Sequence, residues 1–192
     1  KKMKKILILL LALSTLNLIS AEIINQKQHK DNSLILTKTK KDTGSIIYAI
    51  KKEYSKDKSK TLIKEAIYYL NEKGEDVVKI KNYDLLGFMT NISEFKNAKL
   101  HGKTKINFEE SDKLKIIVEY KEGIRHGITE EFLLNGSLKS TSEYKNDLLH
   151  GRLITFYKDT KQKDNEYFYE NGKIVGFIKY RENGTIIKKK MK

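Results

Sequence analysis

A six-residue motif recurs at a nearly fixed interval along the C-terminal half of this chain. The segment 122–127, EGIRHG, has one relative 25 residues earlier, NAKLHG, which ends at Gly102. A second relative, NDLLHG, ends at Gly151, and a less similar copy, NGKIVG, ends at Gly176. The closing glycines are therefore 25, 24 and 25 residues apart. A fixed period of this size indicates a repeat architecture, in which each unit is one supersecondary element stacked on the next.

Aromatic residues recur with the same period. Each unit has one early aromatic residue and one late one. The early residues are Phe108, Phe132 and Phe156, and the late residues are Phe95, Tyr120, Tyr144 and Tyr169. A lone hairpin cannot bury its apolar face, whereas stacked hairpins can share one. We therefore expect the late aromatic residue to fill the same place in each unit, in a core built in register.

A turn is predicted near the middle of each unit. The turn segments are ESDK at 110–113, NG at 135–136, DTKQKD at 159–164 and ENG at 182–184. Asn-Gly before a β-rich run is a strong hairpin signal, because both residues tolerate positive φ. The sequence thus predicts an all-β fold, an elongated antiparallel sheet of stacked β-hairpins with 24–25 residues per repeat.

The motif itself is predicted to form the second turn of each unit, where the chain reverses into the next hairpin. Glycine is expected there because a side chain would clash at the reversal. The residues expected to define these turns are His101, Gly102, His126, Gly127, His150, Gly151 and Gly176.

The segment 120–127, YKEGIRHG, resembles the signature of MORN repeats, which have an aromatic residue, an acidic-Gly turn and a His-Gly step. The inserted FLLNGSL hairpin resembles the bacterial variant known as the YwqK-like antitoxin repeat. The resemblance covers roughly residues 87–187 and reaches weakly back to Tyr68. It implies stacked hairpins and no shared catalytic residues. This chain departs from the pattern at Asn97-Ala98, at Asn146-Asp147 and at Val175, which replaces a histidine.

Residues 22–86 are also β-rich and are expected to form degenerate repeats or a cap. A hairpin is predicted around residues 42–44, DTG, and another turn at residues 72–74, EKG. Residues 61–70 fit either a strand or a short helix, because their apolar residues also follow helical spacing. The Ile-Tyr-Tyr-Leu end and the turn that follows favour a strand.

The first 21 residues have the pattern of a secretory signal peptide, a basic start followed by 14 apolar residues and a small residue at Ala21. The alternative, a permanent anchor, needs roughly 20 apolar residues to span a bilayer. Cleavage near Ala21 would give an extracytoplasmic protein that is periplasmic, cell-surface or secreted. The chain has no cysteine, so it has no disulfide and no lipid-modified cysteine.

The chain is strongly basic. Its formal charge is +14, and without Lys1, Lys2, Lys4 and Lys5 it is +10. Such a balance attracts anionic lipid, nucleic acid or acidic glycans. It is also what an A/T-rich genome produces on a solvated surface, and both interpretations stay open. Nucleic acid is not expected for a chain with an export signal.

The three recurring histidines do not fit a shared metal site. Strands lie about 4.8 Å apart, so equivalent histidines in neighbouring units lie roughly 10 Å apart, too far for one ion. A structural role in the turns, pH sensing or ligand contact remain as interpretations. The sequence has no G-x-S-x-G motif, no phosphate-binding loop and no cysteine nucleophile. We therefore expect no enzyme activity, cofactor or metal.

The first functional hypothesis is an exported protein-interaction module, acting in adhesion, surface association or neutralisation of a partner protein. Tyr and Arg are enriched in the cores of protein interfaces. The candidate contact residues are Tyr120, Arg125, Tyr144, Arg152 and Tyr169. The alternative for the tyrosines is a purely structural ladder.

The second hypothesis is binding to an anionic phospholipid surface through the basic repeat face and the C-terminal tail, residues 188–192. Each lysine near such a surface contributes roughly 1 kcal/mol. The candidate residues are Lys188, Lys189, Lys190 and Lys192. A solvated terminus is the alternative for this tail. Exposed sheet edges could also pair with another copy of the chain, so no oligomeric state is predicted.

Overall fold

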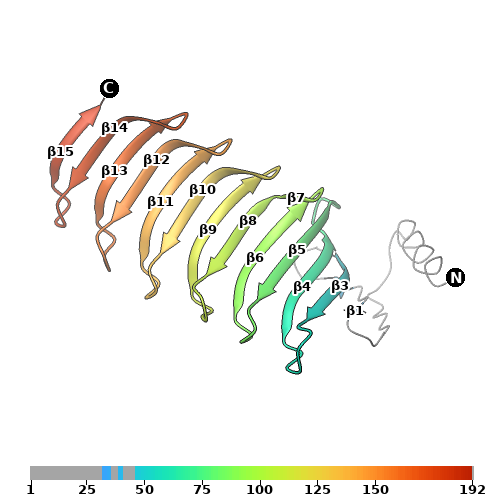
Figure 1. Ribbon diagram of the computed structural model, residues 1–192. Coiled ribbons are helices and arrows are strands. Elements are labelled where there is room, and N and C mark those ends of the chain that lie inside the picture. The colour runs from blue at the N-terminus through green and yellow to red at the C-terminus, as the bar shows by residue number, and fades with distance from the viewer. Residues whose placement is uncertain (1–31, 36–38, 41–45, 192) are drawn as a thin grey trace.

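The protein is a single, elongated antiparallel β-sheet (Figure 1). The computed structural model describes residues 32–35, 39–40 and 46–191, and the predicted signal peptide lies outside these residues. No helix occurs in the described part of the chain. The strands are β1 (Asn32–Ile35), β2 (Thr39–Lys40), β3 (Ile46–Tyr54), β4 (Leu62–Leu70), β5 (Asp76–Tyr83), β6 (Met89–Lys96), β7 (Lys99–Leu100), β8 (Gly102–Asn107), β9 (Leu114–Lys121), β10 (Ile124–Phe132), β11 (Leu138–Lys145), β12 (Leu148–Phe156), β13 (Lys163–Glu170), β14 (Lys173–Tyr180) and β15 (Ile186–Met191).

The sheet is built from consecutive hairpins, as the repeat period predicts. From β3 to β6, and again from β8 to β15, each strand pairs with the next one in the chain, while β2 pairs with β3 and β7 with β6. Residues 62–70 form β4, so the strand interpretation of this segment is confirmed. The predicted turn at residues 42–44 lies outside the described residues, although β2 and β3 on either side of it pair antiparallel.

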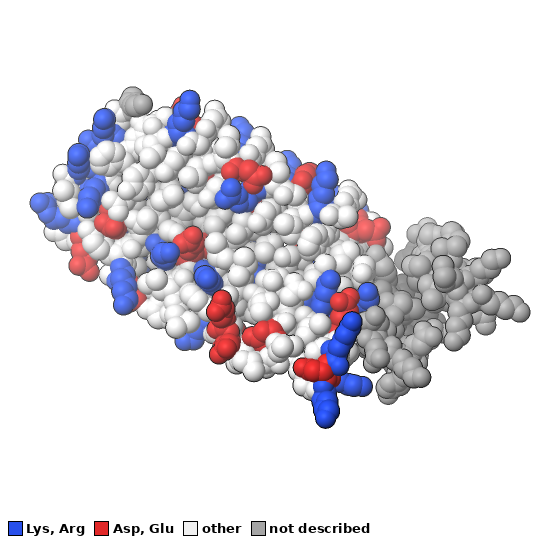
Figure 2. Space-filling model, viewed as in Figure 1, with Lys and Arg blue, Asp and Glu red and all other residues white. Residues whose placement is uncertain are grey.

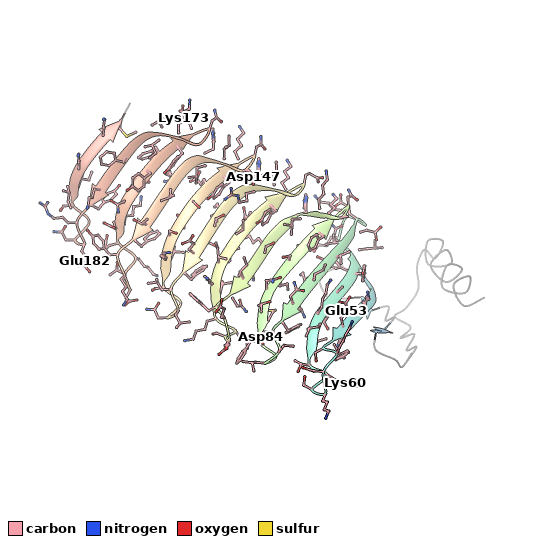
Figure 3. All side chains as sticks on the ribbon, viewed as in Figure 1. Glu53, Lys60, Asp84, Asp147, Lys173 and Glu182 are labelled. Atoms are coloured by element: carbon pink, nitrogen blue, oxygen red, sulfur yellow. The ribbon has the colours of Figure 1, made fainter. Side chains whose placement is uncertain are left out.

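Two-residue turns line one long edge of the sheet. They are formed by Asn97-Ala98, Glu122-Gly123, Asn146-Asp147 and Asn171-Gly172, and all eight residues have positive φ. Two positive φ angles define the type I′ turn, whose twist matches that of the flanking strands. Figure 3 labels Asp147 and Lys173 at this edge.

The opposite long edge carries longer loops, which include the predicted mid-unit turns. Residues 133–137 are typical of these loops, because the Leu133 N–H donates to the Ser137 carbonyl at 2.9 Å. The Asn135 side chain then accepts a hydrogen bond from the Ser137 N–H at 3.0 Å. Figure 3 labels Lys60, Asp84 and Glu182 at this edge. The predicted turns at 110–113, 135–136 and 182–184 fall there, as does the predicted turn at 159–164 except for its last two residues, which begin β13.

The His-Gly step lies in a strand after the turn, and not in the turn itself as expected. His126 and Gly127 lie within β10, where the register with β9 shifts between Arg125 and Thr129. This is a β-bulge, an insertion that leaves extra residues opposite one partner. The recurring glycine therefore lies four residues beyond the two-residue turn, where it marks a bulge.

The bulge explains the glycine through a close approach of side chain to backbone. Gly127 has a φ of +113°, and a Cβ placed there would overlap the carboxylate of Glu119. Gly151 would meet Glu143 in the same way, and a Cβ at Gly102 would lie 3.1 Å from a carboxylate oxygen of Glu94. The first three units thus each pair a recurring glycine with a glutamate eight residues before it.

The sheet has one layer. Among the described residues, only Ala66, Val77 and Val118 are buried apolar residues, and no large side chain is fully buried. The core expected between stacked aromatic residues is therefore replaced by two open faces, each packed only by neighbours in its own layer. Domains are normally built from two packed layers, so an open layer leaves surface for another molecule.

Candidate functional site: the two faces of the sheet

One face of the sheet has a central row without charge, which ends at Lys51 on β3 and at Lys190 on β15. Residues directly opposite each other on paired strands project to the same face, so the register identifies its members. A central row crosses the strands from β4 to β14 without a charged residue. It consists of Ala66, Ile80, Ser93, Thr104, Val118, Thr129, Ser142, Leu153, Tyr167 and Phe177. We call the face that carries this row the uncharged face. In Figure 2, charged side chains gather along the long edges of the visible face and uncharged ones cover most of its middle.

The side chains of the central row are less exposed to solvent than those of the rows on either side. Ala66, Ser93, Thr104, Val118 and Thr129 are all buried, although no second layer covers them among the described residues. Their side chains are small, so the longer side chains of the rows on either side shield them from solvent. The hydroxyl of Thr104 also donates to that of Ser93 at 3.2 Å.

The late aromatic residues form a second row on the uncharged face, nearer the two-residue turns. Tyr120 is paired with Gly102, Tyr144 with Gly127 and Tyr169 with Gly151. An aromatic side chain opposite a glycine covers the backbone that the glycine leaves open and stabilises the pair. This row therefore explains why the glycine and the late aromatic residue recur together, because each of these bulge glycines is covered by the tyrosine of the next strand. All of these tyrosines are half-buried, and burial raises the pKa of Tyr169.

Arg125 joins two neighbouring turns on this face. Its Nε donates to a carboxylate oxygen of Asp147 at 3.2 Å, and one terminal nitrogen donates to the Asp147 carbonyl at 3.1 Å. The guanidinium carbon lies 4.3 Å from the ring centre of Tyr144. The backbone N–H of Arg125 and then its guanidinium hold the pKa of Asp147 below its usual value. The guanidinium thus makes structural contacts within the chain.

Tyr144 should contribute to stability mainly through its ring. We expect Tyr144→Phe to change the free energy of unfolding by less than about 0.5 kcal/mol, since the ring still covers Gly127 and still lies under Arg125. Tyr144→Leu should lower it by about 1–2 kcal/mol, because it removes the aromatic cover and the cation–π contact. Urea unfolding of the two variants measures the difference. Equal losses in both variants would show that the hydroxyl, and not the ring, matters.

The other face carries a ladder of alternating charges. Lys79 lies 2.8 Å from Glu94, Lys103 lies 3.3 Å from Glu119, and Arg152 lies 3.3 Å from Glu143. These are the glutamates that accompany the bulge glycines. Glu94, Glu119 and Glu143 recur at 25 and 24 residues, directly before the late aromatic residue, so the sequence contains a periodic signal for this face as well. We call this the charged face.

The expected contact residues are therefore divided between the faces. Tyr120, Arg125, Tyr144 and Tyr169 lie on the uncharged face, whereas Arg152 lies opposite Phe168 on the charged face. Arg152 also approaches Glu166, at 3.7 Å. One partner on one face cannot contact all five residues.

Glu166 is the most buried ionisable residue on the charged face, with 4% of its surface exposed. One carboxylate oxygen accepts hydrogen bonds from the Lys163 ammonium at 2.9 Å and from the Tyr180 hydroxyl at 2.8 Å. Burial by itself would raise the pKa of Glu166. The two donors and the nearby Arg152 outweigh burial, so the pKa lies below its usual value.

Two of the three recurring histidines approach the following two-residue turn. His150 Nδ1 accepts a hydrogen bond from the Asn171 N–H at 3.4 Å, and His101 Nδ1 lies 3.4 Å from a carboxylate oxygen of Glu122. Within the described residues, no three His, Cys, Asp or Glu side chains are placed to hold a metal ion. The observed contacts of these histidines are with the turns.

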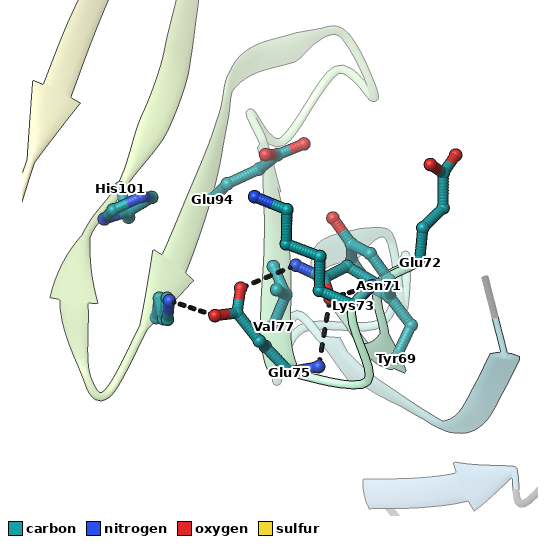
Figure 4. Close-up of a pocket in the computed structure, with 9 residues that line it drawn as sticks. Tyr69, Asn71, Glu72, Lys73, Glu75, Val77, Glu94 and His101 are labelled. Atoms are coloured by element: carbon teal, nitrogen blue, oxygen red, sulfur yellow. Dashed lines mark hydrogen bonds and ion pairs between the residues drawn. The ribbon is translucent and has the colours of Figure 1, made fainter. Parts of the chain in front are cut away.

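A hollow of about 390 Å³ lies beside the loop between β4 and β5 (Figure 4). Tyr69, Val77 and His101 contribute to its lining. Two ion pairs, Lys96–Glu75 and Lys79–Glu94, each 2.8 Å long, neutralise parts of its wall. Its chemistry is that of a polar surface hollow.

The basic C-terminal segment forms a strand. Lys188, Lys189 and Lys190 are exposed on β15, which pairs with β14, and Lys192 lies outside the described residues. Successive strand residues point to opposite faces, so Lys189 projects away from Lys188 and Lys190. The ammonium of Lys188 lies 5.6 Å from the ring centre of Phe177. The described residues contain no helix long and apolar enough to cross a membrane.

Comparison of the sequence with protein-family models found no match, and a search of curated proteins found no similar one. The resemblance to MORN repeats therefore stays a prediction.

Proposed function

We propose that the protein is a non-enzymatic interaction module that binds another protein on its uncharged face. The observation that carries this proposal is the contrast between the faces. The central row from Ala66 to Phe177 has no charged member, in a chain whose formal charge is +14. Interface cores are depleted of charge and enriched in tyrosine, which matches this face and its aromatic row.

The size of the face also supports a protein partner. The main path of the sheet contains 13 strands. At about 4.8 Å per strand this path extends for roughly 60 Å. Most of the strands have eight or nine residues, which gives a width of roughly 27 Å at about 3.3 Å per residue. A standard protein interface needs about 800 Å² from each partner, and half of this face would supply it.

Two neighbouring residues on β11 allow a matched test. Ser142 belongs to the uncharged face, and Thr141, between Glu130 and Ile154, belongs to the charged face. The tagged chain is used to recover bound proteins from the extract and medium of the cells that produce it. We expect Ser142→Arg to abolish recovery of a discrete partner that wild type and Thr141→Arg retain, because a charge buried at an interface core is costly. Loss in both variants, or in neither, would contradict binding on the uncharged face.

Binding to anionic phospholipid is the alternative. Lys189 projects away from Lys188 and Lys190, so these lysines do not form one continuous patch. A membrane surface could contact only part of them at once, and the case for lipid binding is therefore weaker than the case for a protein partner. Co-sedimentation with anionic and neutral vesicles tests it. Binding to anionic vesicles alone, persisting at physiological salt and lost when Lys188, Lys189, Lys190 and Lys192 become Gln, would favour the membrane function.

A further inference from the structure

The end strand β15 carries a run of positive charge. On the charged face, several cationic residues of inner strands meet a carboxylate on the neighbouring strand. Lys79 on β5 meets Glu94 on β6, and Arg152 on β12 meets Glu143 on β11. The ion pairs between described residues include none of Lys188, Lys189 and Lys190. β15 therefore carries three successive positive charges without a described carboxylate partner.

β15 also has an open side. In the described sheet it hydrogen-bonds to β14 alone, from Ile186 to Met191, and all six of its residues are exposed. A strand at the end of a sheet presents unpaired N–H and C=O groups on its outer side, ready to pair with another extended chain. At this end the described structure thus combines free backbone groups with uncompensated positive charge.

These observations together select the chemistry of a partner. We infer that β15 is a docking edge for an acidic, extended peptide segment, which adds one strand to the sheet and places carboxylates beside Lys188 and Lys190 on one face or beside Lys189 on the other. Backbone hydrogen bonds give affinity in this mode of recognition, and side chains opposite each other across the strands give specificity. Lys190, opposite Phe177, and Lys188, opposite Lys179, project to the uncharged face at its β15 end, whereas Lys189, opposite Ile178, projects to the charged face. Strand addition uses the backbone groups of β15, so this inference does not depend on the function proposed for the uncharged face.

The same charges oppose pairing of β15 with a second copy of itself. In such a pair the lysines of the two copies would lie opposite one another, and like charges directly opposite across two strands are destabilising. Lysine on an edge strand is a common protection against unwanted pairing. An acidic strand removes the repulsion, so the edge discriminates between partners by charge.

The test uses the purified full-length chain and fluorescent peptides of about eight residues, a usual strand length. The acidic probe alternates Glu and Val, and the basic probe alternates Lys and Val. A third probe has the charge of the first with proline in place of valine, so that it cannot form a strand ladder. Fluorescence anisotropy at physiological ionic strength should show at least tenfold tighter binding of the acidic probe than of either other probe. Equal binding of the proline probe would overturn strand addition.

Charge reversal tests the site itself. In the variant with Lys188, Lys189 and Lys190 changed to Glu, the affinity for the acidic probe should fall at least tenfold and the affinity for the basic probe should rise. The control reverses Lys56, Lys58 and Lys60, three exposed lysines in the loop between β3 and β4, and should bind like wild type. Weakening by both variants would overturn the proposal in favour of a nonspecific effect of net charge. Lys189→Glu alone should weaken binding in the same direction, and circular dichroism checks that each variant is folded.

Vesicles containing phosphatidylserine provide the last arm. Three results together would refute the docking edge and assign the lysines to a membrane surface. The vesicles would displace the acidic probe, the triple reversal would abolish vesicle binding, and the proline probe would bind as well as the acidic one. Hydrogen exchange completes the assay, since strand addition should slow exchange of β15 amides in the complex with the acidic probe. Unchanged exchange in that complex would also refute it.

Discussion

Gly127→Ala should lower the free energy of unfolding by about 2–3 kcal/mol, the largest loss expected from adding one methyl group to this sheet. A positive φ costs a non-glycine residue roughly 1–2 kcal/mol. Overlap with a neighbour adds about 1 kcal/mol, the lower end of the usual cost of overpacking, because the nearest atom belongs to the end of the flexible Glu119 side chain. Both conditions hold at Gly127, whose φ is +113° and whose added Cβ would overlap the Glu119 carboxylate. Urea unfolding of the variant and wild type measures the loss.

Gly136 provides the matched control. Its φ is +87°, but nothing lies within 4 Å of an added Cβ. Gly136→Ala should therefore show only the backbone term, roughly 1–2 kcal/mol. Adding Glu119→Ala to Gly127→Ala should restore part of the loss, because it removes the group that the new Cβ meets. Equal losses at the two glycines, with no coupling to Glu119, would show that the bulge tolerates a side chain.

The fourth repeat supports this pairing of glycine and glutamate. Phe168 stands eight residues before Gly176, in the position that glutamate holds in the other units. The φ of Gly176 is not in the left-handed region, and Val175 replaces the histidine. Glutamate, histidine and the positive φ are thus lost together, as expected if they form one local structure.

The period and the turn residues were enough to predict the fold. Asn-Gly pairs and evenly spaced aromatic residues indicate hairpins, and a constant interval indicates that the hairpins stack in register. The sequence could not show that the sheet has a single layer. Hydrophobic spacing marks an apolar row such as the one at Val118, but it carries no information on whether another layer covers that row.

The candidate contact residues could be located only in part, because their faces depend on strand register. Arg125 is the second residue after its turn and Arg152 the fifth after the next. An odd difference in position places them on opposite faces. Both resemble an arginine beside the His-Gly step in the sequence, yet Arg125 lies over Tyr144 and Arg152 beside Glu143. Counting from the turns, once these are known, recovers this distinction.

Glu166→Gln should lower the free energy of unfolding at neutral pH by about 1.5–3 kcal/mol, the usual contribution of hydrogen bonds to a charged group. The carboxylate is 4% exposed and accepts hydrogen bonds from Lys163 and Tyr180. Glutamine keeps the size of the side chain but loses its charge. Lys163 and Arg152 are more exposed, so they regain contact with water and limit the loss.

The pH dependence of this difference identifies the charge as its cause. The pKa of Glu166 is lower in the folded chain than its ordinary value of 4.5, so the folded state holds the carboxylate ionised. Its stabilisation is fully present above pH 4.5 and is lost as the pH falls through the folded pKa. Wild type and Glu166→Gln should therefore differ most at neutral pH and converge in acid. Glu65, whose pKa is also lowered, titrates in both proteins and cancels from the comparison. A difference that stays constant from pH 7 to pH 3 would assign the effect to packing instead.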